Sequence, residues 1–412
     1  VIESAQHGLT YTSGLAPADL HDYDLASVSG WIATGRRLET HYLALPDSRL
    51  HRALQFLHAR QAASFSAWDG RLSDLKGRSR RLGVSSNRPL SATSLERWAR
   101  CPFAFFLGNI LGLAALETPE EVTAISALER GSLLHKVLER LVLISYERGD
   151  LPDYGKPWET SHYQLVIQIA EEEFAFAQAK GITGKRLLWE AAKEEMLHDL
   201  SFCLEEDSRW RAERSCRPIF VEKRFGFDVP DAMPPVSIEL ASGVQVRFRG
   251  LIDRVDSNQA GTLVTVIDYK SGSSSSYRDM DRDPLAAGRR LQLPIYGLAI
   301  RALTKATAQI EAQYWFMTSR GNFVRKVAPL HDVEEKFLEV IGTIVDGIQE
   351  GIFPAVPGPA GRENRPANCV FCDFDRVCPA DRDVLWERKR QDPSLKLYLG
   401  LLGVTDAEES GS

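Results

Sequence analysis

Two neighbouring segments decide the fold of this chain: VRFRGLIDRVD at residues 246–256 and LVTVIDYK at residues 263–270. Both are rich in β-branched and other apolar residues, which favours strands, and the SNQAGT between them has the composition of a turn. A hairpin about that turn brings Asp253 almost opposite Asp268, because the two residues lie about equally far from its centre. Lys270 lies two residues after Asp268 and therefore on the same face of its strand. The sequence thus predicts two carboxylates and an ammonium group at one end of a hairpin.

This group of side chains is typical of a divalent-metal site. Carboxylate oxygens are the ligands that Mg²⁺ and Mn²⁺ prefer. A metal bound by them polarises a phosphate and makes hydroxide available near neutral pH, and the lysine neutralises charge that builds on the phosphate. We therefore expect a metal-dependent phosphodiesterase. Taken singly, however, an Asp-x-Lys is usually a solvated strand end, and Asp253, Arg254 and Asp256 could form a surface ion-pair cluster of little energetic value.

The composition is that of an ordinary globular protein. The chain has 412 residues, of which 44% are hydrophobic and 26% charged, and this length predicts a large core and two lobes. The net charge of −6 argues against uniform attraction to nucleic acid. Residues 76–100 are locally basic, which is usually a solvated surface but is a plausible DNA-backbone contact beside a phosphodiesterase site. The candidate DNA-contacting residues there are Arg78, Arg80, Arg81, Arg97 and Arg100.

The sequence gives no sign of a membrane or secreted protein. It has no visible signal peptide, and its longest apolar stretch, residues 103–116, is too short to cross a bilayer. We therefore expect a cytoplasmic protein without a membrane partner, in which the six cysteines do not form disulfides. Because the chain begins with Val1 and not methionine, we expect it to be a fragment of something longer.

The remaining periodicity predicts an α/β fold with a mixed central β-sheet flanked by helices. Apolar spacing predicts helices within residues 31–68, and the basic, serine-rich stretch after them places a domain boundary near residues 87–90. A serine and threonine cap predicts a helix from residue 91. Further helices are expected at residues 127–147, 163–180, 187–214, from 292 and at 333–351, and further strands at 219–229, 237–240, 313–317 and 323–327.

Four motifs in a fixed order resemble the PD-(D/E)XK nuclease superfamily, and in particular its AddB/RecB branch. They are RGSLLHKVLE at residues 130–139, GLIDRVD at 250–256, IDYKSG at 267–272 and QLPIY at 292–296. The resemblance implies a PD-(D/E)XK core over residues 90–395 with a helical insertion at about 150–216. It also implies that residues 1–89 are a helical segment ending a helicase-like region, while residues 396–412 are read as a partly disordered tail.

The same resemblance assigns roles to individual residues. It implies that His135, Asp253, Asp268 and the backbone carbonyl of Tyr269 bind Mg²⁺ or Mn²⁺, with the histidine nitrogen favouring Mn²⁺. It implies that Lys270 positions the attacking water or neutralises charge on the phosphate. Two more residues one helical turn apart are expected to orient Lys270 or touch the DNA backbone, and one acidic residue supports the site. These are Gln292, Tyr296 and, as the supporting residue, Glu222.

Four cysteines have a ligand-like arrangement. Cys369, Cys372 and Cys378 form a C-x₂-C-x₅-C that needs a fourth thiolate, and Cys101 lies far upstream. The spacing alone fits either tetrahedral zinc or an iron–sulfur cluster. The resemblance to AddB-type nucleases implies a 4Fe-4S cluster, with a mechanical role, because it would close a very long loop around the core. We expect nearby aromatic rings to shield it: Phe103, Phe371 and Phe374.

The resemblance implies an exonuclease that prefers single-stranded DNA. The resemblance implies that it is the nuclease part of a bacterial helicase–nuclease for double-strand-break repair and recombination, with a helicase subunit or domain as its partner. Two alternatives remain open. One is a DNA-end-binding module with a vestigial site, against which the intact Asp253, Asp268 and Lys270 argue. The other is a stand-alone nuclease of the CRISPR-adaptation type, which is usually shorter and lacks the first helical segment and the insertion.

Overall fold

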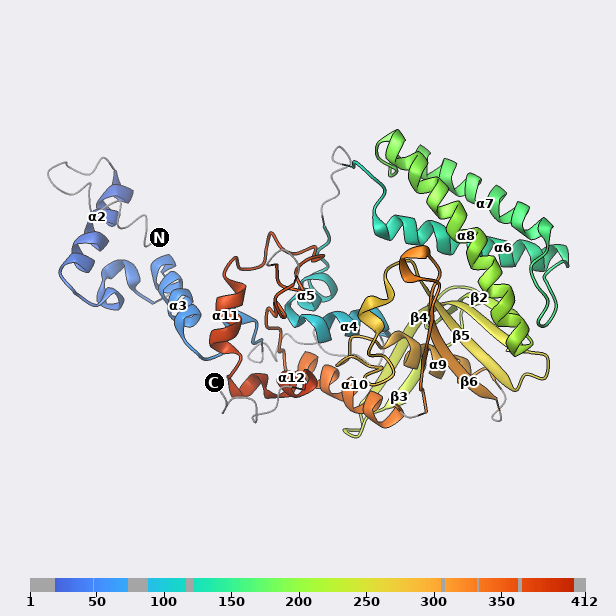
Figure 1. Cartoon of the computed structure of the whole chain (residues 1–412). Coiled ribbons are helices and arrows are strands. Elements are labelled where there is room, and N and C mark those ends of the chain that lie inside the picture. Colours follow the sequence, from blue (N-terminus) through green and yellow to red (C-terminus); the bar gives the residue numbers. More distant parts are fainter. Residues whose placement is uncertain are drawn as a thin grey trace.

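The computed structural model describes residues 19–46, 48–72, 88–115, 122–304, 308–331, 333–361 and 365–403. At its centre is a mixed sheet between two groups of helices (Figure 1). The strand order is β1-β4-β5-β6-β7, and β2 and β3 also pair with β4. The predicted α/β architecture is therefore confirmed. The strands are β1 Leu90–Ser91, β2 Cys216–Phe225, β3 Val236–Glu239, β4 Gln245–Asn258, β5 Leu263–Lys270, β6 Gln309–Phe316 and β7 Arg325–Ala328.

The hairpin expected from the central segments is present. Strands β4 and β5 are antiparallel, with Arg254 opposite Ile267 and Ser257 opposite Val264. Between them, the side-chain oxygen of Asn258 accepts the backbone N–H of Thr262. Gly261 has a φ of 68°, a backbone conformation that glycine adopts at little cost. The turn therefore fixes the strand register that aligns Asp253 with Asp268.

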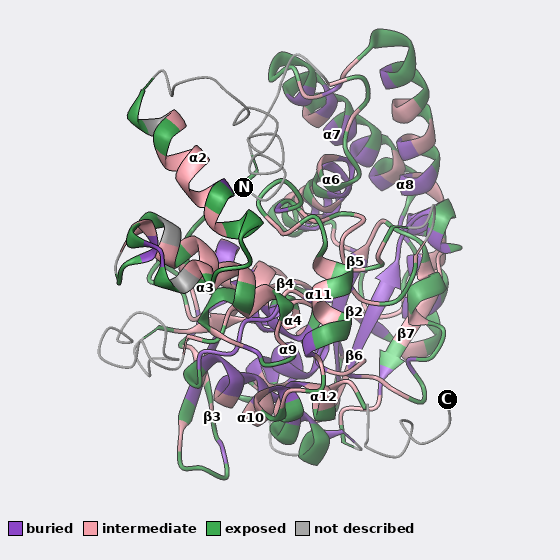
Figure 2. Cartoon of the chain, turned by 90° about the vertical axis from the view of Figure 1, so that its left-hand side faces the viewer, coloured by how far each residue is buried: buried purple, intermediate pink, exposed green. Residues whose placement is uncertain are grey.

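One face of the sheet is covered by helices α4 (Ala92–Arg100), α9 (Gln292–Arg301) and α10 (Glu334–Gln349). The hydroxyl of Ser91 accepts the N–H of Ser94 and so caps α4, as its sequence predicts. Trp98 of α4 is fully buried and packs in one core with Phe248 of β4 and Ile344 of α10. In Figure 2 the buried residues gather in the central strands and in α9. This layer anchors the helices that reach the lysine of the site.

The other face carries a helical lobe made of α6 (Ala127–Arg148), α7 (Thr160–Ala179) and α8 (Arg186–Arg214), which lies above the sheet in Figure 1. A second core joins this lobe to the sheet through Ile267 and Trp315. The lobe contains the insertion predicted at residues 150–216, and α6 leads into it. Cys203 and Cys216 are buried in this core, where a free cysteine packs as a small apolar side chain.

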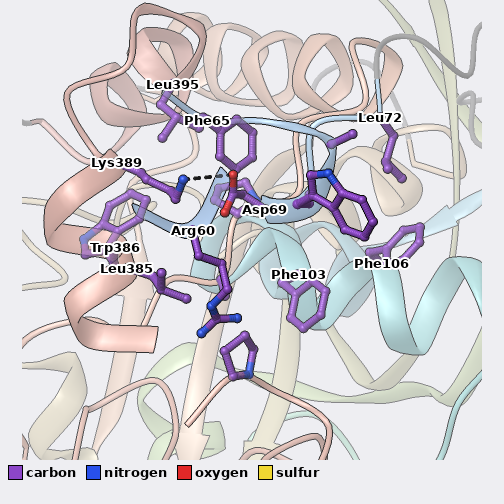
Figure 3. Close-up of a pocket in the computed structure, with 16 residues that line it drawn as sticks. Arg60, Phe65, Asp69, Leu72, Phe103, Phe106, Leu385, Trp386, Lys389 and Leu395 are labelled. Carbon is purple, nitrogen blue, oxygen red and sulfur yellow. Dashed lines mark ion pairs between the residues drawn. The ribbon is translucent and has the colours of Figure 1, made fainter. Parts of the chain in front are cut away.

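The first and last parts of the chain meet beside this domain. Helix α2 (Leu20–Ala33) lies farthest from the sheet, whereas α3 (Arg49–Gln61) lies near α11 (Arg382–Lys389) (Figure 1). The buried ammonium of Lys389 donates to the carbonyls of Ala59, Ala62 and Ser64 and pairs with Asp69 at 3.0 Å. A hollow of about 180 Å³ lies at this junction (Figure 3). It is lined largely by apolar side chains, among them Phe65, Phe103, Phe106, Trp386 and Leu395.

The remaining short helices lie at the same end of the molecule. They are α5 (Pro102–Phe105), which a short π-helix at Phe106–Ile110 continues, and α12 (Lys396–Leu401). The predicted tail thus starts with a helix, whose Tyr398 is fully buried and donates to the carbonyl of Ala99. Residues 404–412 of that tail lie outside the described residues. Within the described part of the chain, no helix has the length and apolar character needed to cross a membrane.

Candidate active site

Asp253 and Asp268 stand where the β4–β5 ladder ends. The last paired residues are Arg254 and Ile267, and the aspartates come next in each strand. In place of a further ladder bond, the Asp253 carboxylate accepts the N–H of Tyr269 at 2.7 Å. Because the N–H and C=O of one strand residue face the same neighbour, the Tyr269 carbonyl is turned towards Asp253 as well. The strands therefore part at this point and leave the two carboxylates beside each other.

Lys270 is held between two oxygen atoms. Its ammonium lies 2.5 Å from Oδ2 of Asp268 and donates to the side-chain oxygen of Gln292 at 2.8 Å. Burial lowers the pKa of Lys270, but the Asp268 carboxylate more than offsets this and raises the pKa above its usual range. The side chain is about a quarter exposed, at 24%. Lys270 is therefore a fixed, charged group whose head still reaches the surface of the site.

His135 and Glu222 approach Asp253 from two other elements. The Nδ1 atom of His135, on α6, lies 3.5 Å from Oδ2 of Asp253. Glu222 lies on β2 between Val221 and Lys223, which pair with the residues on either side of Asp253. One ligand atom each from His135, Glu222 and Asp253 lies within 4.8 Å of the others, a spacing that suits a common metal ion. Asp268 is outside this trio, and its carboxylate pairs with Lys270 instead.

The trio concentrates negative charge. Burial, followed by the charges of Asp253 and Glu139, raises the pKa of Glu222 to about 7. Burial lowers the pKa of His135, but its contact with Asp253 outweighs this and raises it. Glu222 also has a φ of 48°, a left-handed conformation that is rare and costly for a residue other than glycine. A bound cation would relieve the repulsion between these carboxylates, so the donor set fits a divalent metal ion.

Glu96 is a partly buried member of the site that sequence reasoning missed. Its carboxylate accepts the N–H groups of Leu291 and Gln292, at 2.6 Å and 3.2 Å, and thereby caps the start of α9. Burial raises the pKa of Glu96, while the nearby Lys270 lowers it. In the sequence, Glu96 stands out only as the single acid of a basic stretch. Nothing local indicates its role, because its partners lie 195 and 196 residues away.

Tyr296 lies on the same helix as Gln292, one turn further on. It is buried, and its ring packs edge-on against Phe225 at a centroid distance of 6.0 Å. Burial and the charge of Asp268 raise the pKa of Tyr296 well above its usual range. A Cβ atom at Gly250 would lie within 3 Å of both rings, which explains the glycine that precedes the Asp253 segment. Tyr296 therefore packs as a neutral phenol behind Lys270 and Gln292.

The predicted cysteine ligands come together. Cys101, Cys369, Cys372 and Cys378 line one small cavity, which Phe103 and Phe374 also line. No three of their sulfur atoms lie within 4.8 Å of one another in the part of the chain that the structure describes. The expectation for Phe371 was wrong: this ring is 97% exposed, because the turn after Cys369 directs it away from the core.

The candidate DNA-contacting arginines are only partly described. Arg78, Arg80 and Arg81 lie outside the described residues. Arg97 and Arg100 lie on the exposed side of α4, and Arg97 donates to Asn109 at 2.9 Å. The structure therefore leaves these two arginines accessible but gives them no contact with the metal-binding trio.

Comparison with known proteins agrees with this geometry. The chain is similar to several bacterial proteins that are each named as the B subunit of an ATP-dependent helicase/deoxyribonuclease. It is 30% identical over 213 residues to that of Clostridium tetani, which is 50% of this chain and 17% of that protein. It is 28% identical over 284 residues to that of Symbiobacterium thermophilum, which is 66% of this chain and 22% of that protein. It is 26% identical over 320 residues to that of Moorella thermoacetica, and the match covers 74% of this chain and 25% of that protein.

The match therefore spans no more than a quarter of these relatives' own length. The family-level comparison covers well over half of this chain. Residues 89–379 match the PD-(D/E)XK nuclease superfamily, a range that includes β1 to β7, the metal-binding trio, Asp268 and Lys270. The chain belongs to the PD-(D/E)XK nuclease superfamily.

Proposed function

We propose that this chain is a metal-dependent deoxyribonuclease that hydrolyses phosphodiester bonds in DNA, preferentially as an exonuclease on single strands. The observation that carries the proposal is the convergence of Asp253, Asp268 and Lys270 with His135 and Glu222 at the parted end of β4 and β5. Acidic ligands beside a fixed ammonium group suit phosphodiester hydrolysis. The superfamily match over residues 89–379 supports the same chemistry.

His135, Glu222 and Asp253 would hold the metal, with Asp268 and the Tyr269 carbonyl completing its surroundings. The carboxylates suit Mg²⁺ or Mn²⁺, and the histidine nitrogen favours Mn²⁺. Such an ion supplies an activated water and polarises the phosphate. Asp268 keeps Lys270 charged, and Gln292 aims the ammonium group. Lys270 can then stabilise negative charge that develops on the phosphate.

We also propose that the four cysteines hold a 4Fe-4S cluster. The thiols line one cavity, which meets the first requirement of any four-thiolate site. The same four thiolates could also hold zinc, and the resemblance to AddB-type nucleases favours the 4Fe-4S cluster. A cluster would join the segment at Cys101 to the segment at 369–378 and so fasten the two ends of the nuclease domain.

The larger assembly is also a proposal. The relatives, whose names describe one part of an ATP-dependent helicase/deoxyribonuclease, support a role as the nuclease part of a bacterial helicase–nuclease that processes DNA breaks in the cytoplasm. A helicase subunit or domain would then feed one DNA strand to the site. Exposed Arg97 and Arg100 are candidate contacts for the strand or for the partner, because both carry positive charge on one side of α4.

Digestion of end-labelled DNA tests the activity. The 412-residue chain is incubated with single- or double-stranded DNA in Mg²⁺, in Mn²⁺ and in EDTA. We expect metal-dependent cleavage that is faster on single strands, and a loss of at least about 100-fold in Lys270→Ala. Lys156→Ala removes an exposed lysine of the helical lobe and serves as the matched control. Undiminished cleavage by Lys270→Ala would refute the proposed site.

A further inference from the structure

A hollow of about 530 Å³ lies directly beside the candidate metal site, between α6 and β2. This volume falls within the range of roughly 300–1,000 Å³ that is usual for ligand sites. Glu222 belongs both to the metal-binding trio and to the wall of the hollow. Anything bound in the hollow therefore lies next to the reacting centre.

Helix α6 connects the two places. His135, Glu139, Val142 and Tyr146 follow one another at helical spacing, so they share one face of α6. Glu139, Val142 and Tyr146 line the hollow, whereas His135 belongs to the metal-binding trio. Tyr146 lies eleven positions after His135, which corresponds to roughly 16 Å along the helix. The hollow thus continues from the active site along α6.

The walls combine exposed aromatic rings with two cations and three acids. Tyr146 on α6 is 70% exposed, and Phe220 on β2 is 37% exposed. The ammonium of Lys223 lies 5.2 Å from the Phe220 ring, and Arg224 is exposed at the same wall. Glu139 and Asp231 line the hollow in addition to Glu222. Glu139 pairs with Lys136. Aromatic rings with nearby cations are the combination that binds single-stranded nucleic acid.

We propose that this hollow binds the unpaired bases of a DNA strand next to the bond that is cut. Bases stack on Tyr146 and Phe220, and phosphates face Lys223 and Arg224. Stacking needs bases released from a duplex, so the hollow selects single strands. This inference rests on the proposed nuclease function and names the side chains that hold its single-stranded substrate.

Binding measurements test base stacking in the hollow separately from the proposed nuclease activity. In a Lys270→Ala background, fluorescence anisotropy compares a labelled oligothymidylate with an abasic strand of equal length. We expect Tyr146→Ala with Phe220→Ala to weaken oligothymidylate binding about five-fold or more and to leave abasic binding unchanged. Arg224→Ala is expected to weaken both strands equally and to reduce the salt dependence, because it removes a phosphate contact. The control is Phe176→Ala, which removes a ring that is 57% exposed on α7.

Unchanged oligothymidylate binding in the aromatic double variant would overturn the inference and assign the hollow to another occupant, such as a peptide of a partner. Equal losses for both strands would also overturn it, because they would reflect altered folding instead of base stacking. The proposed nuclease function fails on a different result, namely absence of metal-dependent cleavage by the unmodified chain.

Discussion

At the scale of single residues, the candidate site depends on how Lys270 is held. Asp268 supplies the charge that keeps its pKa high, and Gln292 supplies a directed oxygen. Neither partner moves independently of the fold, since Gln292 begins α9 and Asp268 lies within β5. The ammonium group is therefore positioned before any substrate binds, which is the condition for efficient electrostatic stabilisation.

Glu96 helps to position Lys270 indirectly, because it holds the start of α9 and therefore Gln292. We expect Glu96→Ala to lower kcat about 10- to 100-fold with a small change in KM, because the start of α9 and hence Gln292 lose their anchor. Steady-state kinetics on single-stranded DNA measure both constants. Thr93→Ala, an exposed change on the same helix, is expected to retain activity. Wild-type kcat in Glu96→Ala would show that Glu96 has no positioning role.

At the scale of elements, β4 is tied to the helical lobe by buried charges. Asp207 of α8 contacts Arg254 of β4 at 3.0 Å, Arg211 at 2.8 Å and Arg325 of β7 at 3.5 Å. Arg254 also pairs with Asp256 at 2.6 Å. Arg254 adjoins Asp253 in the sequence, so this network holds the strand that carries the metal-binding carboxylate. The cluster is buried, not the surface group that the sequence alone allowed.

We expect Asp207→Asn to lower the free energy of unfolding by about 3 kcal/mol or more, since it leaves buried guanidinium groups without a counter-charge. Urea denaturation near neutral pH measures the change. Glu205→Gln affects a half-exposed residue of the same helix and is expected to cost less than about 1 kcal/mol. Equal stabilities of the two variants would mean that the network does not hold the lobe.

The stability that Asp207 contributes is expected to be lost only in strong acid. Burial raises the pKa of Asp207, but Arg254, Arg211 and Arg325 outweigh it and bring the pKa below its usual range. A carboxyl group with a lowered folded pKa stabilises the protein above its unfolded pKa of about 4, and this is lost as the pH falls through the folded value. The stability difference between wild type and Asp207→Asn should therefore stay constant from about pH 8 to about pH 5 and shrink only in stronger acid.

At the scale of the whole molecule, distant parts of the chain are fastened at one end of the domain. Cys101 meets the 369–378 segment, and Asn368 donates to the carbonyl of Arg100 at 2.9 Å. The segment before residue 73 joins the same region, where Phe65 packs with Ile352 and Leu395. A cluster bound to the four cysteines would close a long loop that contains β2 to β7, and cross-links of long loops stabilise most in principle.

The cysteine proposal predicts a brown protein with broad visible absorption and about four irons per chain after anaerobic purification. Cys378→Ser is expected to lose the colour and to melt at a lower temperature, because the fastening is removed. Cys203→Ala changes a buried cysteine of the helical lobe and should keep its iron. Iron and zinc analysis decides the matter: a colourless protein with stoichiometric zinc would contradict the cluster.

The sequence by itself determined the features that local patterns encode. The alternation of apolar residues and the turn at Asn258–Gly261 fixed the β4–β5 register, which aligned Asp253 with Asp268 and placed Lys270 on the same face. Helix starts such as Ser91 were equally local, because a cap lies within a few residues of the N–H that it accepts.

Only the tertiary structure decided which distant residues complete the site. Glu222 joins the metal-binding trio because β2 pairs with β4, and Glu96 reaches α9 because two helices pack on one face of the sheet. Packing of the helical lobe on the sheet buried Arg254 beside Asp207. Such pairings depend on the energy of the whole fold, since residues far apart in sequence carry no local signal of their contact, whereas strand register and capping are set within a few residues.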